Sequence, residues 1–346
     1  MKHHGSDCGF DRSLHYAAYP TLMPIPATKT KVSETRIPAP EAPLSAESYT
    51  GDLLDGKPHG KGTMIYPNGD VYEGWWISGR RHGWGKLTRS NGDVFEGSWI
   101  HDDYDRGTMT YANGDVYEGT WLFAAPKEGR MTYANGDVYE GFWLLGVWNQ
   151  GKMTYADGRI YDGQWRNDQY DGQGRLTCPA GGTYKIYDGW WKNGERHGKG
   201  KIRYADGAVY EGWWEHDKRH GRGKITYPWG GVYEGKWEDD QYHGQGKKTF
   251  PDGRVYEGQW RGSFRDGTGK LTYANGDTYE GLWEVGRCCG QGTYTFAAGG
   301  VYTGTFQTDE NDKPIGGTGT YRQRGFSRPA EWKNGTMIKK RRGLFF

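Results

Sequence analysis

One short phrase recurs along almost the whole chain and limits the folds that the chain can adopt. Residues 68–74 read Asn-Gly-Asp-Val-Tyr-Glu-Gly, and variants of this phrase follow at intervals of 22 or 23 residues, with one interval of 26. Its aromatic residue occupies twelve positions: Tyr49, Tyr72, Phe95, Tyr117, Tyr139, Tyr161, Tyr187, Tyr210, Tyr233, Tyr256, Tyr279 and Tyr302. Repeats of this length form units that contact mainly their neighbours. The sequence therefore predicts a one-dimensional array and not a layered domain around one core.

Each unit has the pattern of a β-hairpin. Residues 198–214 have no helical period, and an Asp-Gly pair, which is a turn signal, lies at their centre. The aromatic faces of the two strands match only if the loop has an odd number of residues, such as a three-residue turn with a left-handed Gly. That register sets Ile202 opposite Tyr210, Gly200 opposite Gly212 and Gly198 opposite Trp214. Glycine beside a large ring lets the ring lie flat and lets the sheet bend.

Charged residues that were not used to choose this register agree with it. The register pairs opposite charges on the outer face in seven units: Glu211–Lys201, Glu96–Lys86, Glu140–Arg130, Asp162–Lys152, Glu234–Lys224, Glu257–Lys247 and Glu280–Lys270. In two other units Glu73 and Glu118 face Thr63 and Thr108. Because an exposed pair contributes only about a few tenths of a kcal/mol, the pattern supports the register more than it explains stability.

The chain divides into three segments by composition and periodicity. Residues 1–48 are rich in proline and are predicted to be extended or disordered. Residues 49–321 are the repeat array, and residues 322–346 form a degenerate cap, with a hairpin signal at Asn334-Gly335, and a basic tail. The predicted fold is all-β: an elongated, curved, single-layer antiparallel meander of about twelve hairpins. Units three to five are one residue short and have a single Gly in place of Gly-x-Gly, so we expect a change of curvature between residues 100 and 190.

Composition and spacing argue against catalysis, cofactors and metals. The net charge is +2, so no overall field attracts nucleic acid. Most carboxylates face cations across the strands, and the Gly-Lys at 269–270 is followed by Leu271, where a phosphate-binding loop needs Ser or Thr. Histidines recur at one repeat position, but they are two strands or about 9.5 Å apart, too far to share an ion, and we interpret them as turn residues. They are His59, His82, His197, His220 and His243.

The cysteines and the apolar residues indicate a reducing compartment. Cys8, Cys178, Cys288 and Cys289 share no disulfide framework, and no stretch resembles a signal peptide or approaches the roughly 20 apolar residues of a membrane span. We therefore expect a cytoplasmic protein with reduced thiols.

The repeating unit resembles the MORN repeat. Tyr-Glu-Gly-x-Trp is followed by His-Gly-x-Gly and a further turn, as in residues 210–230, and the likeness covers about 270 of the 346 residues. The resemblance implies a curved single-layer β-sheet and a scaffold in cytoskeletal, ciliary or membrane-junction assemblies. It also implies that the chain dimerises or holds a partner segment in its groove; lipid binding has been proposed for the family too.

From this resemblance we expect a non-enzymatic structural scaffold whose partners are other structural proteins. The first expectation is a ciliary or flagellar axoneme, in a radial-spoke-like assembly of the cytoskeleton. One alternative is a membrane-associated organiser that binds anionic phospholipid through basic residues, although most lysines are paired. Another is a regulatory module of an enzyme, but no catalytic domain is attached. The partner itself is not named by the sequence.

Three regions are predicted to make the contacts. A single-layer sheet is expected to leave its aromatic face partly uncovered, which would form a partner-binding groove. The candidate groove residues are Tyr72, Trp75, Tyr117, Trp121, Tyr139, Trp143, Tyr210, Trp214, Tyr256 and Trp260. The basic tail, comprising Lys339, Lys340, Arg341 and Arg342, is a candidate anchor to an acidic partner or membrane. The open sheet edge at the C-terminal end is expected to contact a second copy or a close paralogue.

Overall fold

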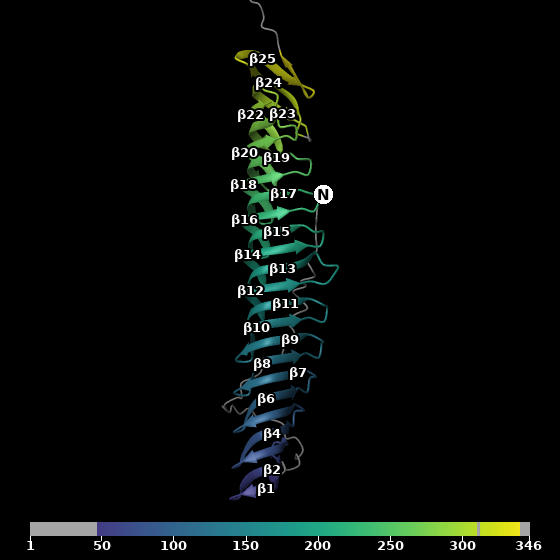
Figure 1. The fold of residues 1–346 in the computed structure, drawn as a ribbon, viewed down its shortest axis with the longest axis vertical. Helices are drawn as coiled ribbons and strands as arrows, with labels where there is room; N and C mark the ends of the chain where they lie inside the picture. Colours follow the sequence, from purple (N-terminus) through teal and green to yellow (C-terminus); the bar gives the residue numbers. More distant parts are fainter. Residues whose placement is uncertain (1–46, 310–311, 340–346) are drawn as a thin grey trace, which may run out of the picture. The chain divides into compact units, whose positions relative to one another are not determined.

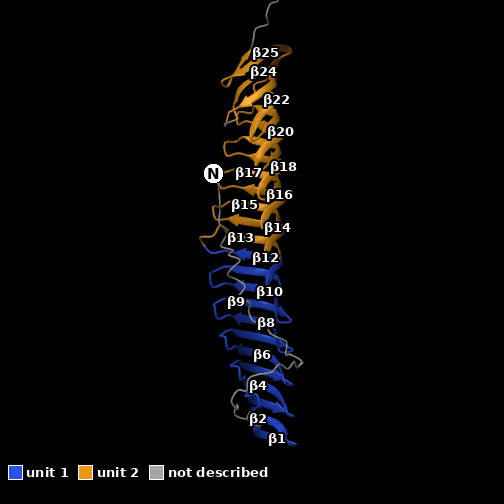
Figure 2. Ribbon diagram, turned by 180° about the vertical axis from the view of Figure 1, so that it is seen from behind, with its two compact units in different colours: residues 1–179 blue, residues 180–346 orange. Residues whose placement is uncertain are grey.

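The computed structural model describes residues 47–309 and 312–339, which form 26 β-strands and no helix (Figure 1). They fall into two compact units, which meet in the sequence between Pro179 and Ala180 (Figure 2). Within each unit every strand pairs antiparallel with the next strand in the chain. The predicted all-β class and the single-layer antiparallel meander are confirmed.

Twelve strands belong to the first unit and fourteen to the second. The first unit contains β1 (Ser48–Leu54), β2 (Lys57–Ile65), β3 (Val71–Ile77), β4 (Arg80–Thr88), β5 (Val94–Ile100), β6 (Asp103–Thr110), β7 (Val116–Leu122), β8 (Ala125–Thr132), β9 (Val138–Leu144), β10 (Val147–Thr154), β11 (Ile160–Arg166) and β12 (Gln169–Thr177). The second contains β13 (Tyr184–Lys192), β14 (Glu195–Tyr204), β15 (Val209–Glu215), β16 (Lys218–Thr226), β17 (Val232–Glu238), β18 (Gln241–Thr249), β19 (Val255–Arg261), β20 (Phe264–Thr272), β21 (Thr278–Glu284), β22 (Arg287–Thr295), β23 (Val301–Thr308), β24 (Pro314–Gln323), β25 (Phe326–Lys333) and β26 (Thr336–Lys339).

The predicted hairpin register is confirmed between β14 and β15. Ile202 faces Tyr210, and Gly200 faces Gly212. The loop between the two strands has three residues, 205–207, and its last residue, Gly207, has a φ of +94°. The N–H of Gly207 donates to the Tyr204 carbonyl, which closes the turn at 3.1 Å. The left-handed glycine gives the odd loop length that keeps both aromatic sets on one face.

We call the face that carries the Tyr and Trp residues of the repeats the inner face, and the face that carries the charged pairs the outer face. On the inner face each tyrosine ring lies flat against glycine backbone. A Cβ on Gly223 would come within 2.3 Å of the Tyr210 hydroxyl, and that hydroxyl donates to the Trp213 carbonyl on the same strand at 2.9 Å. Trp214 and Trp237 hold Tyr210 edge-on at ring distances of 5.1 and 5.2 Å. Because most of these tyrosines contact an aromatic ring of their own repeat and one of the next, a single repeat cannot complete its core alone.

On the outer face the charges alternate across successive strands. The predicted pairs lie opposite each other, and Lys86–Glu96, Lys201–Glu211 and Lys224–Glu234 form ion pairs of 2.7, 3.1 and 3.7 Å. Five of the seven acids also face a second cation on their other side, as Glu211 faces both Lys201 and Lys224, whereas Glu96 and Glu280 face a threonine there. The sequence did not predict this second partner, because each strand belongs to two hairpins and the predicted register describes only the one with the three-residue turn.

The last strands continue the antiparallel pairing. β24 pairs with β25 from Gly316 to Gln323, and the predicted hairpin at Asn334-Gly335 connects β25 to β26, with both turn residues left-handed. Of the basic tail, only Lys339 is described, and its ammonium lies 4.2 Å from the ring centre of Tyr321. Lys340, Arg341 and Arg342 lie outside the described residues, as does the proline-rich segment up to residue 46.

Candidate protein-interaction surfaces

Nine of the ten candidate groove residues lie on the inner face as predicted, and one does not. Trp75 is on the outer face, 46% exposed, with the Lys61 ammonium 5.5 Å from its ring. Tyr72, Gly74 and Trp76 alternate on the inner face, so Trp76, which is 3% exposed, takes the place expected for Trp75. The prediction for Trp75 is wrong because side chains on a strand change face at every residue.

The inner rings are not an open strip. Tyr72, Tyr117, Tyr139, Tyr210 and Tyr256 have no exposed surface, and Trp121, Trp143, Trp214 and Trp260 are between 3 and 7% exposed. Their burial comes from ring-to-ring contacts between neighbouring repeats and from the flat seating of each tyrosine on glycine. The expectation that a single sheet leaves these rings uncovered is therefore wrong, whereas a role of the inner face in binding stays a prediction.

A set of arginines on the inner face was missed from the sequence. Each guanidinium stacks on the tryptophan of the next repeat at 4.3 to 4.6 Å: Arg81 on Trp99, Arg196 on Trp214, Arg219 on Trp237 and Arg265 on Trp283. Three of these arginines also donate their Nε–H to an aspartate in a turn 21 residues later. The pairs are Arg81–Asp102, Arg196–Asp217 and Arg219–Asp240. The recurring Arg-His-Gly, with Asp 21 positions later, was a signal for this contact, which we call the Arg–Asp staple.

The staple joins adjacent repeats by a partly buried charge pair. The Arg196 side chain is only 10% exposed, and Asp217 Oδ1 lies 2.9 Å from its Nε. Burial opposes the charged form of Arg196, but the Asp217 carboxylate holds its pKa above the ordinary value. Arg196 therefore keeps its charge, and the Asp217 carboxylate replaces part of the water that its burial removes.

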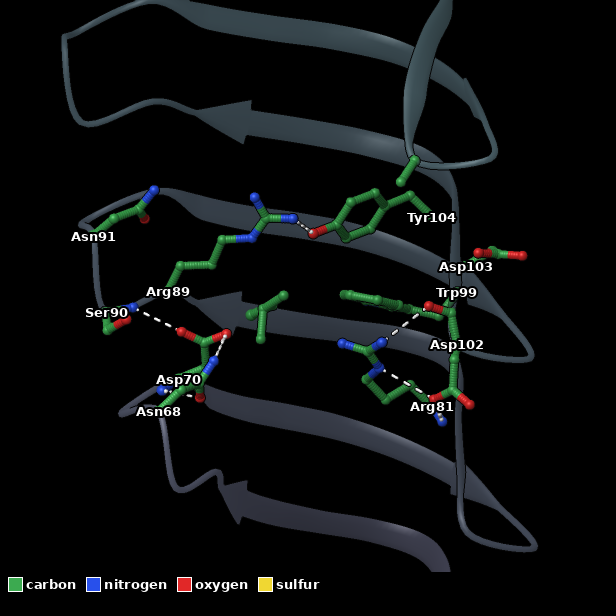
Figure 3. A pocket seen from close by; sticks show the side chains of 12 residues that line it. Asn68, Asp70, Arg81, Arg89, Ser90, Asn91, Trp99, Asp102, Asp103 and Tyr104 are labelled. Carbon is green, nitrogen blue, oxygen red and sulfur yellow. Dashed lines mark hydrogen bonds and ion pairs between the residues drawn. The ribbon is translucent and has the colours of Figure 1, made fainter. Parts of the chain in front are cut away.

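An open hollow of about 550 Å³ lies on the inner face of the first unit (Figure 3). It is lined by Asn68, Asp70, Arg81, Leu87, Arg89, Ser90, Asn91, Trp99, Asp102, Asp103, Tyr104 and Ala124. Arg89 points across it and donates to the Tyr104 hydroxyl at 2.7 Å, while Arg81 is held by Asp102 (Figure 3). Burial raises the pKa of Tyr104, although Arg89 acts against this. These polar groups are fixed by one another, and an arrangement of this kind suits binding more than bond-making.

An apolar surface begins at the rim of this hollow. Ala124, which lines the hollow, forms the β7–β8 turn together with Phe123, and Leu145 begins the equivalent β9–β10 turn. Phe123 is 83% and Leu145 91% exposed, and both are left-handed, with φ of +49° and +52°. Leu122 and Leu144, which precede these turns, and Ile100, which precedes the β5–β6 turn, are half-exposed or more. We call Ile100, Leu122, Phe123, Leu144 and Leu145 the apolar turn patch. Its sequence signal was the replacement of polar turn residues by Leu-Phe-Ala-Ala and Leu-Leu-Gly-Val.

The repeated histidines lie in strands and not in turns, which corrects the interpretation made from the sequence. His82 faces Trp75 and His220 faces Trp213, next to a bulge in each case. Among the described residues, no group of three or more His, Cys, Asp or Glu side chains is arranged to hold a metal ion. Cys288 and Cys289 are free thiols. Within residues 47–309 and 312–339, no helix has the length and apolar character required to span a bilayer.

Comparison with known proteins identifies the family of the repeats. A model of the MORN repeat matches residues 49–71, 72–94, 106–116, 139–158, 161–183, 187–209, 210–232, 233–253, 256–278 and 279–301, which together make up more than half of the chain. A search of curated proteins found no match. Among solved structures, the Drosophila melanogaster SAS-4 (dCPAP) TCP domain, solved in complex with a proline-rich motif of Ana2 (dSTIL), is 15% identical with a TM-score of 0.23, over 58% of this chain and 96% of that one. On the repeat matches, this chain belongs to the MORN-repeat family.

Proposed function

We propose that the protein is a non-enzymatic scaffold that holds a segment of a partner protein against its first unit. The segment would lie in the hollow around Arg89 and Tyr104 and extend over the apolar turn patch. The observation that carries this proposal is their continuity, because Ala124 belongs both to the hollow and to the β7–β8 turn. MORN repeats generally build scaffolds that bind proteins or membranes.

The apolar turn patch and the polar hollow together have the composition of a protein interface, which combines an apolar centre with hydrogen-bonding groups at its side. Large apolar side chains such as Phe123 and Leu145 lose most of their exposed area only when a partner covers them. The fixed Arg89–Tyr104 and Arg81–Asp102 pairs then provide hydrogen-bonding groups at the side of an apolar contact. Left-handed Phe and Leu are unfavourable choices for a turn, and partner binding supplies a reason for them.

We place this scaffold in a cytoskeletal assembly, with a ciliary or flagellar axoneme as the first setting to test. Support for this setting comes only from the family resemblance. Other structural proteins are the proposed partners, and the cytoplasmic side of the cell is the proposed location.

Site-specific crosslinking in ciliated cells tests the proposal directly. A photoreactive amino acid replaces Leu145 in one variant and Asn193, the equivalent turn residue of the second unit, in the control. We expect a defined structural protein to crosslink at position 145 and not at 193. The affinity of the purified partner should then fall at least about ten-fold for Phe123→Asn/Leu145→Asn, since hot-spot apolar residues commonly contribute that much. Equal crosslinking at both positions, or unchanged affinity, would contradict the proposal.

We also retain the proposed self-contact at the C-terminal end. β26, with four residues, is the last described strand of the second unit, and its outer edge is where a second copy would add a strand of its own. If two copies join there, removing residues 300–346 should convert a dimer into a monomer in light scattering, while the far-ultraviolet spectrum stays that of a β-protein. A full-length chain that is monomeric at all concentrations would overturn this proposal.

A further inference from the structure

A row of cations and indoles crosses the outer face of the second unit. Going across the strands, it consists of Trp190, Lys199, Trp213, Arg222 and Lys236, all of them exposed, and we call it the outer strip. Lys199 faces Trp213, with its ammonium 5.6 Å from the indole ring, and Arg222 faces Lys236 directly. Trp190 and Trp213 are each 47% exposed. The outer strip thus combines positive charge with flat apolar surface.

The cations of the outer strip differ from the other lysines of this face. Lys201 and Lys224 lie opposite glutamates and form ion pairs with Glu211 and Glu234. By contrast, Lys199, Arg222 and Lys236 make no ion pair with any carboxylate in the part of the chain that the structure describes. They are therefore free to meet the charges of another molecule.

One contact within the outer strip works against the fold. Arg222 and Lys236 lie directly opposite each other on β16 and β17, and like charges in this position repel. The following repeats place neutral residues there, Gln245 against Gln259 and Thr268 against Leu282. Since the repeat tolerates glutamine at this position, the fold does not require the two cations. A bound anion would remove the repulsion.

Carboxylates border the outer strip on both sides and restrict what can bind. Glu211 and Glu234 lie two residues away along the strands on one side, and Glu215 and Glu238 lie two residues away on the other. Two residues of a strand span about 6.8 Å, so the positive surface is narrow. A bilayer or a nucleic-acid duplex would bring phosphates against these glutamates, whereas a single extended chain would not.

We propose that the outer strip binds an acidic, extended segment of a partner protein. From β14 to β17 the strip crosses three strand spacings, about 14 Å, which an extended peptide covers with about four or five residues. Carboxylates of the segment pair with Arg222 and Lys236, and its chain lies against Trp213. This inference adds a second contact to the proposed scaffold, and it involves a different unit from the apolar turn patch.

Fluorescence anisotropy with labelled hexa-glutamate and the full-length protein tests the proposal. The test variant is Arg222→Gln/Lys236→Gln, which copies the residues of the next repeat. The control, Lys224→Gln/Lys247→Gln, removes the same charge from paired positions. We expect the affinity of the test variant to fall about five-fold or more, as for two lost ion pairs, and that of the control to change less than about two-fold. An equal loss in both variants, or none in the test variant, would overturn the proposal.

Two further measurements test whether the two cations serve the fold, a membrane or a nucleic acid instead of an acidic peptide. The test variant should be at least as resistant to urea as the parent protein, because the like-charge contact is gone; lower resistance would show that the pair serves the fold. Phosphatidylserine vesicles and double-stranded DNA, tested as competitors at equal charge, should displace hexa-glutamate poorly. Strong displacement by either would assign the outer strip to a membrane or a nucleic acid. Neither result depends on Leu145, so these measurements and the crosslinking test of the scaffold proposal can fail independently of each other.

Discussion

Two kinds of repeat build the same inner core with different strands: the regular repeats, and the short repeats of units three to five, which have one residue fewer. In the regular hairpin of β15 and β16, Gly212 faces Gly223 but Trp213 faces His220, so two extra residues bulge out, and one of them, Gly221, is left-handed at +63°. In the short repeat of β9 and β10, Gly141 faces Gly151 and Trp143 faces Trp148, and the only extra residue is Asn149. Short repeats therefore lack one residue and the first glycine of Gly-x-Gly for the same reason. Their bulge has one extra residue instead of two, and that residue is not left-handed.

The two kinds of repeat also differ in how they attach to their neighbours. Four of the regular repeats place an arginine after the turn, and in three of these an aspartate in the next turn accepts from it, as in the Arg196–Asp217 staple. The short repeats place Tyr104, Pro126 or Trp148 at the arginine position. A turn that follows Tyr104 or Pro126 needs no aspartate, and these turns are the ones that carry Phe123-Ala124 and Leu145-Gly146. Loss of the staple therefore leaves the turn free to become an exposed apolar surface.

The largest expected effect tests whether both kinds of repeat are equally well packed. Tyr233 in a regular repeat and Tyr139 in a short one are both fully buried. Replacing either by Ala should lower the free energy of unfolding by about 3–5 kcal/mol, because a large cavity opens between two tryptophans. Urea denaturation followed by tryptophan fluorescence measures this. A cost for Tyr139→Ala of less than half that for Tyr233→Ala would show that the short repeats are loosely packed.

Breaking one staple should have the next largest effect. Asp217→Ala leaves the buried Arg196 without its carboxylate and should cost about 3 kcal/mol. The matched control is Asp239→Ala, which removes an exposed turn aspartate and should change stability by less than about 0.5 kcal/mol. Similar urea midpoints for the two variants would show that the staple does not hold neighbouring repeats together.

Much of the fold could be predicted because its signals are local. Strand alternation, the Gly in the odd loop and the facing charges all act within one hairpin, and the Lys201–Glu211 register followed from them. Trp75 was assigned to the wrong face although the alternation from Tyr72 pointed to Trp76. The burial of the rings could not be read from one repeat, because it arises from contacts such as Tyr210 with Trp237 of the next repeat. The hollow depends on groups 15 to 21 residues apart and was missed for the same reason.

A smaller effect is expected from the glycine that distinguishes the bulges. Gly221→Ala puts a Cβ on a left-handed residue and within 3.3 Å of the Trp213 Cβ, and it should cost about 1–2 kcal/mol. Asn149→Ala alters the extra residue of a short repeat, which is not left-handed, and should stay within about 0.5 kcal/mol. If both substitutions cost the same, the difference between the bulges lies in something other than backbone conformation.

Alkaline pH should unfold both kinds of repeat through their tyrosines. Burial raises the pKa of Tyr117 to about 12 and raises the pKa of Tyr139 and Tyr233 as well. A tyrosine whose folded pKa lies above its unfolded value of about 10 stabilises the fold fully below pH ~10, and this contribution disappears as the pH rises toward the folded pKa. We expect tyrosinate absorbance to appear together with loss of the β-sheet spectrum. Ionisation of most tyrosines in a protein that remains folded would contradict the described burial.

The smallest expected change in stability concerns the apolar turn patch. Asn167 and Asn193 occupy, in other turns, the left-handed position that Phe123 and Leu145 occupy in the short repeats. Asparagine tolerates this conformation better than large apolar residues do. Phe123→Asn and Leu145→Asn should therefore leave stability unchanged or raise it by about 0.5 kcal/mol, measured by urea denaturation. A matched control, Asn193→Leu, should lower stability by a similar amount. If Leu145→Asn were instead destabilising by more than about 1 kcal/mol, Leu145 would be a packing residue of the fold, and its exposure could not be explained by a partner.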